Sequence, residues 1–337
     1  MKGSVKKAII IIGVLIVLVI CVLLNLRPVE NFQQKYEGVD LSADVEGAVR
    51  EGTYTKYLNA HEDAACPAED IEVDLFAYME GEGVEVYENY EGEEKALYTD
   101  TESTVTWKVN VPEAGFYNLY LEYITVESRG VAIERSVYIN GELPFDDGNI
   151  IFTRTWTDAS EPKVDNQGNE IRPSQVEVYK WQSTFCKDDM GYIINPYQFY
   201  FEAGENTITM EGVNEPMVLK KLTLAAIDDS VTYEEYLANC PGEGNSETNI
   251  NYVQVVQGED STIRSESSLY AKYDKSAPNT QPYSVTNTIL NYVGGETWCS
   301  AGQWIEWEFS VPEDGYYNIT VKGRQNYARG SVSSRTV

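Results

Sequence analysis

The sequence carries one pattern twice, in two segments that lie 200 residues apart. Residues 105–137 and 305–337 align without a gap, and each holds a tryptophan followed by a valine-proline-glutamate turn. A repeat at a fixed spacing predicts related modules within one chain. The first copy runs on into Tyr138-Ile139-Asn140-Gly141, whereas the second ends at Val337. We therefore expect an incomplete second module and interpret the chain as a fragment of a longer protein.

Apolar and polar residues alternate within the repeated pattern. In residues 105–111 (VTWKVNV) every second residue is apolar, which is the period of a half-buried strand. Trp107 and its copy Trp307 lie on the apolar face, so we expect both in a core. The pair Asn140-Gly141 favours a hairpin. Together with 25 tyrosines and frequent turn residues, this pattern predicts a mostly β fold built from tandem antiparallel β-sandwich modules.

Two short segments resemble each other as well and help to divide the chain. Residues 53–60 (TYTKYLNA) and 232–239 (TYEEYLAN) each precede a module, and we interpret both as short helices. A join rich in Pro, Gly and Asn follows the second of them. The expected organisation is a membrane anchor at 1–27, an acidic stalk with a short helix at 28–65, a first β-sandwich module at 66–230, a helical linker at 231–249 and a second, incomplete β-sandwich module at 250–337.

The N-terminus has the composition of a membrane-spanning segment. Residues 8–26 (AIIIIGVLIVLVICVLLNL) contain no charge and would span roughly 28 Å as a helix, enough to cross a bilayer core. Three lysines precede them, which places the short N-terminus in the cytoplasm. We therefore expect a transmembrane helix that anchors the protein in the cell membrane by a single pass, with the bulk of the chain extracytoplasmic. A cleaved signal peptide and a lipoprotein site at Cys21 are the alternatives.

The charge balance excludes one class of partner. The chain has 54 acidic and 25 basic residues, a net charge of −29. Such a surface repels nucleic acid and anionic lipid, and it disfavours acidic polysaccharides. We expect no nucleic-acid partner.

Four cysteines follow the apolar segment, namely Cys66, Cys186, Cys240 and Cys299. Four cysteines allow three pairings, and the sequence does not choose among these and free thiols. Their wide spacing and the single histidine, His61, do not indicate a zinc site.

Several further segments are distinctive, namely residues 139–145 (INGELPF), 152–156 (FTRTW), 165–169 (DNQGN), 171–173 (IRP), 290–295 (LNYVGG) and 302–307 (GQWIEW). With these segments, the order of strands and turns resembles galactose-binding-like, carbohydrate-binding-module-like jelly rolls. In particular the chain is similar to the N-terminal modules of membrane-tethered extracellular solute-binding proteins of bacterial sugar ABC importers. This resemblance implies a carbohydrate-binding role and, through a region beyond Val337, an importer permease as partner.

Sugar binding requires flat aromatic faces and a few planar polar groups. Residues 148–192 supply both and are longer than a hairpin loop, and long loops on a rigid sandwich are often functional. For Trp156 and Trp181 a structural alternative remains, in which each ring caps the sandwich core. The predicted site for a neutral oligo- or polysaccharide consists of Arg154, Trp156, Asn166, Asn169, Arg172, Tyr179, Trp181 and Tyr192.

Residues 165–170 (DNQGNE) are rich in oxygen ligands around a glycine turn. They favour two interpretations: a structural calcium ion with Asp165 and Asn169 among its ligands, or an ordinary turn closed by aspartate and asparagine side chains. The segment lacks the full twelve-residue calcium loop and its closing glutamate. We expect no other cofactor.

Enzymatic motifs are not apparent in the sequence. The single histidine leaves a Ser-His-Asp triad without a credible base, and no phosphate-binding or dinucleotide fingerprint occurs. A carboxylate pair for glycoside cleavage stays open, because only separation in space identifies one. We predict a non-catalytic protein. The alternatives are accessory carbohydrate-binding modules of a cell-surface glycoside hydrolase, or structural spacer or adhesion modules without a ligand.

Overall fold

The structure is a computed structural model, and it describes residues 52–227, 252–313, 317–325 and 333–337 together with Thr232, Glu234, Glu235 and Ala238. The expected anchor at 8–26, the first part of the stalk and most of the linker lie outside these residues. Within the described part of the chain, no helix combines the length and the apolar character that crossing a bilayer requires.

The first module is built almost entirely from strands, and one short helix precedes them. The helix is α4 (Tyr54–Ala60), and the strands are β1 (Ile71–Glu72), β2 (Tyr78–Tyr90), β3 (Glu93–Val111), β4 (Gly115–Thr125), β5 (Ile133–Ile139), β6 (Asn149–Phe152), β7 (Trp156–Asp158), β8 (Lys163–Val164), β9 (Glu170–Ile171), β10 (Gln175–Glu177), β11 (Gln182–Phe185), β12 (Gln198–Phe201), β13 (Gly204–Asn214) and β14 (Met217–Ala225). The second segment holds β15 (Ile263–Arg264), β16 (Ala271–Lys272), β17 (Tyr292–Val293), the 3-10 helix η1 (Gly295–Thr297) and β18 (Ile305–Glu306).

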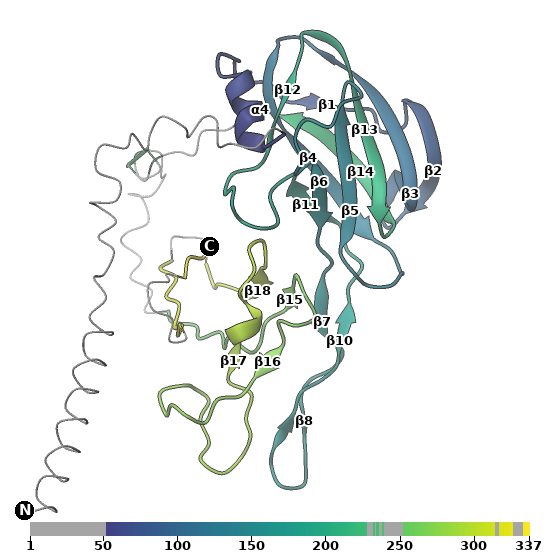
Figure 1. Cartoon of the computed structure of the whole chain (residues 1–337). Coiled ribbons are helices and arrows are strands. Elements are labelled where there is room, and N and C mark those ends of the chain that lie inside the picture. Colours follow the sequence, from purple (N-terminus) through teal and green to yellow (C-terminus); the bar gives the residue numbers. More distant parts are fainter. Residues whose placement is uncertain are drawn as a thin grey trace, which may run out of the picture. The chain divides into compact units, whose positions relative to one another are not determined.

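Ten strands of the first module form one antiparallel sheet that folds over into two layers (Figure 1). The 19-residue strand β3 connects the layers, because its beginning pairs with β14 and its end pairs with β13. Leu97 lies opposite Leu219, and Trp107 lies opposite Ile208. The mostly β, antiparallel architecture predicted for this module is confirmed by the pairing itself.

The apolar side chains of both layers meet in one core. Trp107 is fully buried there, and its indole Nε1 donates to the carbonyl oxygen of Leu75 at 3.0 Å. A buried indole N–H without a hydrogen-bond partner would be costly. This bond therefore holds Leu75, which precedes β2, against the core. The predicted core role of Trp107 is confirmed. Its copy Trp307 is only half-buried, although its Nε1 makes the analogous bond to the carbonyl of Gly258 at 3.1 Å.

The pair Asn140-Gly141 makes the tight turn that its residue types predict. Both residues adopt left-handed backbone angles, with φ of 52° and 81°, which asparagine and glycine tolerate. Ile139 and Glu142 exchange backbone hydrogen bonds across this turn at 2.9 and 3.0 Å.

The short helix expected at 53–60 is present as α4, and it packs on the sandwich. The buried Tyr54 accepts a hydrogen bond from the backbone N–H of Gln198 at 2.8 Å, and Tyr57 accepts one from Tyr200 at 2.6 Å. Burial raises the pKa of Tyr57 to about 12, so both phenols stay neutral. These contacts make the helix part of the folded first module.

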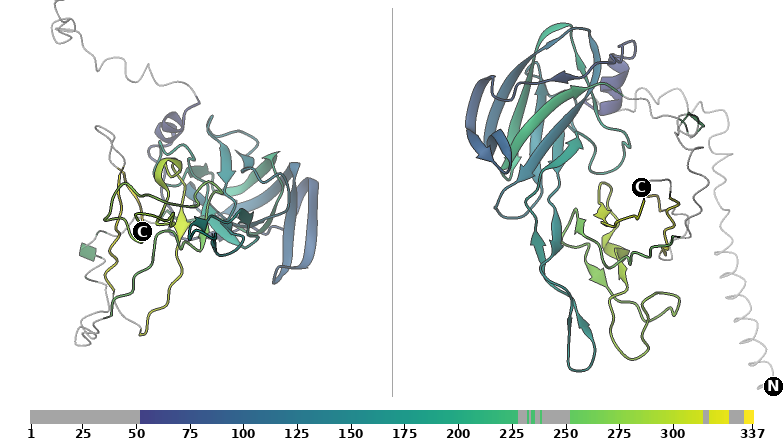
Figure 2. Two further views of the ribbon diagram at one scale, coloured as in Figure 1. Left: turned by 90° about the horizontal axis from the view of Figure 1, so that it is seen from below. Right: turned by 180° about the vertical axis from the view of Figure 1, so that it is seen from behind.

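Residues 153–181 form an arm that leaves the sandwich between β6 and β11 (Figures 1 and 2). Within the arm β7 pairs with β10, and β8 pairs with β9. Strand β7 also pairs with β15, which pairs with β18 in turn, so the order of this four-stranded sheet is β10-β7-β15-β18. The arm therefore shares one sheet with the second segment.

Among the described residues, the second segment has fewer and shorter strands than the first module. In the first copy β3 and β4 are continuous and owe their pairing largely to β13 and β14. The described residues of 252–337 contain no counterpart of either partner, and within 305–311, which match the end of β3, only Ile305–Glu306 is a strand. The second sandwich stays a prediction.

Three of the four cysteines after residue 26 lie in the described part of the chain, and all three are free. Cys66 and Cys299 are exposed, whereas Cys186 is fully buried. Burial raises the pKa of the Cys186 thiol and keeps it protonated.

Candidate functional site

Arg154, the first of the predicted site residues, is buried at the base of the arm. Its guanidinium contacts two carboxylates, Glu177 at 2.5 Å and Glu215 at 2.8 Å, and donates to the hydroxyl of Ser128. Burial alone would raise the pKa of Glu215, but hydrogen bonds from Ser128 and Arg129 and the charge of Arg154 outweigh it and hold the pKa below its ordinary value. Arg154 thus fixes the arm to the sandwich.

A second buried arginine joins the arm to the second segment. Arg264 of β15 has no exposed surface, and its guanidinium contacts Asp158 at 2.8 Å and Gln175 at 3.0 Å. Trp156, another predicted site residue, is half-buried and lies opposite Arg264 in the strand register. This register pair joins β7 to β15 in the four-stranded sheet.

The turn between β8 and β9 is closed by its own side chains. One carboxylate oxygen of Asp165 accepts the backbone N–H groups of Gln167 and Asn169 at 2.8 Å, and the other accepts the Asn169 amide at 3.1 Å. The bonds from Asn169 are the main reason why the pKa of Asp165 is lowered. The Asn169 side-chain oxygen accepts the backbone N–H of Thr288 at 2.9 Å, and Asn166 is exposed.

No group of three or more His, Cys, Asp or Glu side chains gathers within the described ranges as a metal site would require. The hydrogen bonds of Asp165 and Asn169 are those of an ordinary turn closed by aspartate and asparagine side chains. A calcium ion at this turn stays a prediction.

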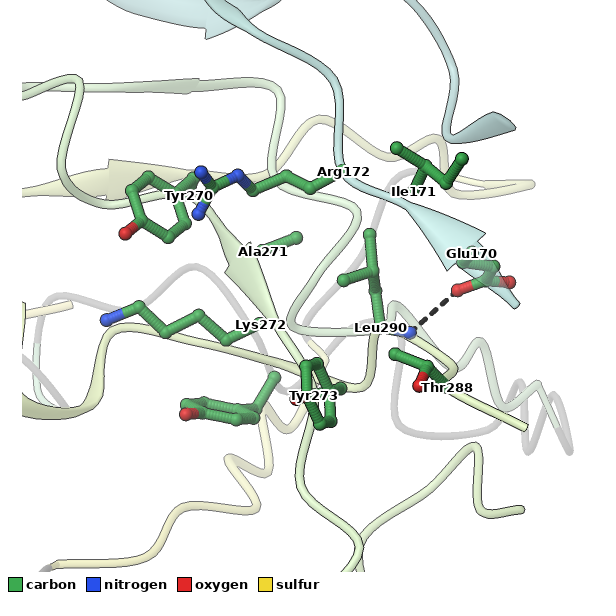
Figure 3. Close-up of a pocket in the computed structure, with 10 residues that line it drawn as sticks. Glu170, Ile171, Arg172, Tyr270, Ala271, Lys272, Tyr273, Thr288 and Leu290 are labelled. Carbon is green, nitrogen blue, oxygen red and sulfur yellow. Dashed lines mark hydrogen bonds between the residues drawn. The ribbon is translucent and has the colours of Figure 1, made fainter. Parts of the chain in front are cut away.

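Beside this turn lies a pocket of about 570 Å³ between β9 of the arm and the second segment (Figure 3). It is the candidate site, and we call it the Tyr270 pocket. Pockets of this size accept small-molecule ligands when aromatic rings and a few polar groups converge on them. Its lining residues are Glu170, Ile171, Arg172, Tyr270, Ala271, Lys272, Tyr273, Thr288, Leu290 and Tyr292.

The strands that meet here determine how these side chains lie. Tyr270, Lys272 and Tyr273 come from β16 and its flanks, and Tyr292 comes from the paired strand β17. Glu170 of β9 accepts the backbone N–H of Leu290 at 2.7 Å, which holds the arm against this pair of strands. Both parts of the chain are therefore needed to form the pocket.

Arg172 and Lys272, the two cationic residues of the pocket, make different contacts. Arg172 lies over the ring of Tyr270, with its guanidinium carbon 3.5 Å from the ring centroid, a close cation–π contact. The ammonium of Lys272 donates to the carbonyl of Gly294 at 2.7 Å and to the hydroxyl of Thr297 at 2.8 Å. One face of the Arg172 guanidinium is thus stacked on Tyr270.

Trp181 lies elsewhere, on the outer face of the sandwich sheet. Its indole Nε1 donates to the carbonyl of Glu91 at 3.0 Å, and the ammonium of Lys220 is 5.0 Å from its ring. Three half-buried tyrosines share this small cluster, namely Tyr87, Tyr90 and Tyr98. We call it the sheet-face cluster.

The predicted site residues therefore do not form one group. Of the eight, only Arg172 lines the Tyr270 pocket, and Asn169 supports the neighbouring turn. Tyr179 and Tyr192 are exposed, the latter by 82%. The tyrosines of the pocket were missed. Their signal in the sequence was the pair of tyrosines in 270–273 (YAKY) together with Tyr292. This segment was predicted only as part of a second sandwich.

Of the three comparisons with known proteins, only the comparison with solved structures found similar proteins. No family model matches the chain, and no curated protein matches it. Solved structures that are similar to it include carbohydrate-binding modules. A GH26-CBM35 β-(1,4)-mannanase of Podospora anserina has 12% sequence identity and a TM-score of 0.30, over 49% of this chain and 29% of that chain.

Two further similar structures are isolated modules. A family 35 carbohydrate-binding module of Clostridium thermocellum has 12% identity and a TM-score of 0.28, over 47% of this chain and 100% of its own. The C-terminal CBM6 of LamC, a marine laminarinase of Zobellia galactanivorans, has 11% identity and a TM-score of 0.29, over 46% and 98%. At this level of similarity the strand pairing alone defines the fold.

Proposed function

We propose that this chain is a non-catalytic carbohydrate-binding region and that the Tyr270 pocket binds a neutral oligosaccharide. The observation that carries the proposal is the convergence of Tyr270, Tyr273 and Tyr292 with the stacked guanidinium of Arg172 in one pocket. Tyrosine rings offer flat faces to the C–H faces of a sugar, and guanidinium donors suit its hydroxyl and ring oxygens.

The charges of the pocket favour a neutral ligand. The carboxylate of Glu170 offsets one of the two cations, Arg172 and Lys272, and the hydrogen bonds of Lys272 engage the other. The chain as a whole carries a charge of −29, so an anionic polysaccharide would be repelled on approach. A neutral oligosaccharide is not repelled by this charge.

The cellular setting of this activity belongs to the same proposal. The apolar segment 8–26 would anchor the protein in the cell membrane, and the remainder would bind glycans outside the cell. The sequence resemblance supports a solute-binding protein of a sugar ABC importer, whose permease would be a partner. Accessory modules of a glycoside hydrolase would use the same pocket in the same way, so glycan binding does not depend on this choice.

A spacer without a ligand is the second candidate, and one observation favours it. Arg154, Trp156 and Asn169 are engaged within the protein, where they hold the arm to the sandwich and to the second segment. An arm of this kind sets the geometry between two parts of a chain whether or not a ligand binds. The two candidates differ in what happens at the Tyr270 pocket.

Binding of the full chain, purified in detergent, to an array of neutral oligosaccharides tests the proposal. For the oligosaccharide that binds best, we expect Tyr273→Ala to weaken the affinity about tenfold, because one stacking face is lost. Tyr192→Ala is the matched control, since Tyr192 is exposed and does not line the pocket. A chain that binds no neutral oligosaccharide on the array is a spacer, and the proposal fails.

A further inference from the structure

Asn287 of the second segment binds the turn at the tip of the arm. Its side-chain amide donates to the carbonyl oxygens of Gln167 and Gly168, at 3.2 and 2.8 Å. Residue 168 has to be a glycine for this contact to form. A Cβ atom there would overlap Nδ2 of Asn287, and its φ of +83° is one that other residues rarely adopt. The glycine therefore serves the contact between arm and second segment as well as the turn.

Further hydrogen bonds extend this contact along both parts of the chain. The backbone N–H of Thr288 donates to the side-chain oxygen of Asn169 at 2.9 Å, and the carbonyl of Thr288 accepts the backbone N–H of Glu170 at 2.8 Å. The backbone N–H of Leu290 donates to the Glu170 carboxylate at 2.7 Å. We call the two joined runs the clasp. The clasp consists of residues 167–170 and 287–290.

The clasp is continuous with the Tyr270 pocket (Figure 3). Glu170, Thr288 and Leu290 belong to both, whereas Asn287 does not line the pocket. One wall of the pocket comes from the arm, and the tyrosines come from the second segment. A ligand that contacts both walls therefore bridges the same two parts of the chain that the clasp joins.

The clasp is a weaker connection between these two parts than the ion pair of Arg264 with Asp158. That guanidinium has no exposed surface and lies 2.8 Å from the carboxylate. Asn287 is only half-buried, and a hydrogen bond that water can replace contributes little net stability. The clasp can therefore open locally while the buried ion pair keeps the arm attached. A ligand that binds only the closed form would shift this equilibrium toward closure.

Given the glycan binding proposed above, on which this inference rests, we propose that Asn287 is a positioning residue of the Tyr270 pocket and that ligand binding closes the clasp. Asn287 holds the two walls at the separation at which one ligand contacts both. Because ligand and clasp join the same two parts of the chain, each stabilises the other, and the coupling is reciprocal.

Calorimetry and hydrogen exchange of the full chain test this coupling. We expect Asn287→Ala to weaken the affinity for the neutral oligosaccharide that binds best on the array about fivefold. Without ligand, the amides of Glu170, Thr288 and Leu290 should exchange faster in this variant. Saturating oligosaccharide should restore their protection, which a variant damaged throughout its fold would not show. The matched control is Asn279→Ala, an exposed residue between β16 and β17 that lies outside the clasp and the pocket lining.

A second variant reaches the same contact from the arm. Gly168→Ala pushes a methyl group against Asn287 and should have the same effect, and the double variant should bind little worse than either single variant. Unchanged exchange at the three amides, or full affinity despite faster exchange, overturns the proposal. An unmodified chain that binds no oligosaccharide contradicts the proposed function instead. The ligand-free exchange of Asn287→Ala then still decides whether Asn287 holds the walls of the pocket.

Discussion

The guanidinium carbon of Arg172 lies 3.5 Å from the centroid of the Tyr270 ring, so that a residue of the arm and a residue of the second segment form one surface. This stacking places the guanidinium of Arg172 against a ring that also lines the pocket. It also means that the pocket exists only while the arm is held in place, which makes the buried contacts of the arm part of the binding account.

Replacing Arg172 should weaken binding more than a loss of charge alone. We expect Arg172→Ala to reduce oligosaccharide affinity about tenfold, because both the stacked plane and its donors disappear. Arg172→Lys keeps the charge but not the plane and should recover only part of the loss. Titration calorimetry of the two variants and the unmodified chain measures this. Full affinity in the lysine variant would show that charge, and not the stacked plane, matters.

The ion pairs at the base of the arm should contribute strongly to the free energy of unfolding. Arg154→Ala leaves Glu177 and Glu215 buried without their main cation, and we expect a loss of about 3–5 kcal/mol in the free energy of unfolding. Arg129 contacts the same Glu215 but has a side chain exposed by 68%, so Arg129→Ala should cost about 1 kcal/mol or less. Urea denaturation of both variants decides. Similar losses in the two would contradict the assigned role of Arg154.

The repeated tryptophans offer a matched pair of substitutions. Trp107 is fully buried, so Trp107→Ala should lower the free energy of unfolding by about 3–5 kcal/mol. Trp307 is half-buried, and Trp307→Ala should cost clearly less than its counterpart. Thermal melts of the two variants under the same conditions compare these costs. A larger loss at Trp307 would mean that the second segment is packed more completely than its contacts show.

Glu259 should make stability depend on pH. Burial is the main cause that raises its pKa from 4.5 to about 7, with further contributions from the charges of Asp260 and Glu170. The folded state therefore binds this proton more tightly than the unfolded state does, so the stabilisation is complete below pH 4.5 and is lost as the pH rises through 7.

Substitution isolates the effect of this one carboxyl group. The unmodified chain should lose on the order of 1 kcal/mol between pH 5 and pH 8 relative to Glu259→Gln, after allowance for solvent screening of a half-buried group. Urea midpoints at the two pH values give the comparison. Parallel pH profiles for the two proteins would show that Glu259 titrates normally.

The sequence alone predicts those structural features that depend on residues close together in the chain. The alternation in 105–111 predicts β3, and Asn140-Gly141 predicts a tight turn because its two residue types tolerate left-handed backbone angles. Trp107 was placed in the core for the same local reason. All of these follow from residues that are neighbours in the chain.

The site depends on contacts between distant residues, which local patterns do not reveal. Asp158 meets Arg264, 106 residues later, and Arg154 meets Glu215, 61 residues later. Polar residues in the long segment 148–192 were therefore predicted as ligand contacts, whereas several of them hold the arm. Alternation also does not show which tyrosines face a cavity, so Tyr270 and Tyr292 could not be singled out.

Hydrogen exchange of the full chain, with and without the neutral oligosaccharide that binds best on the array, tests the central claim most directly. The account predicts protection in three segments that line the Tyr270 pocket, residues 170–172, 270–273 and 288–292. Protection at the sheet-face cluster around Tyr87, Tyr98 and Trp181 instead, with none at these three segments, would contradict it.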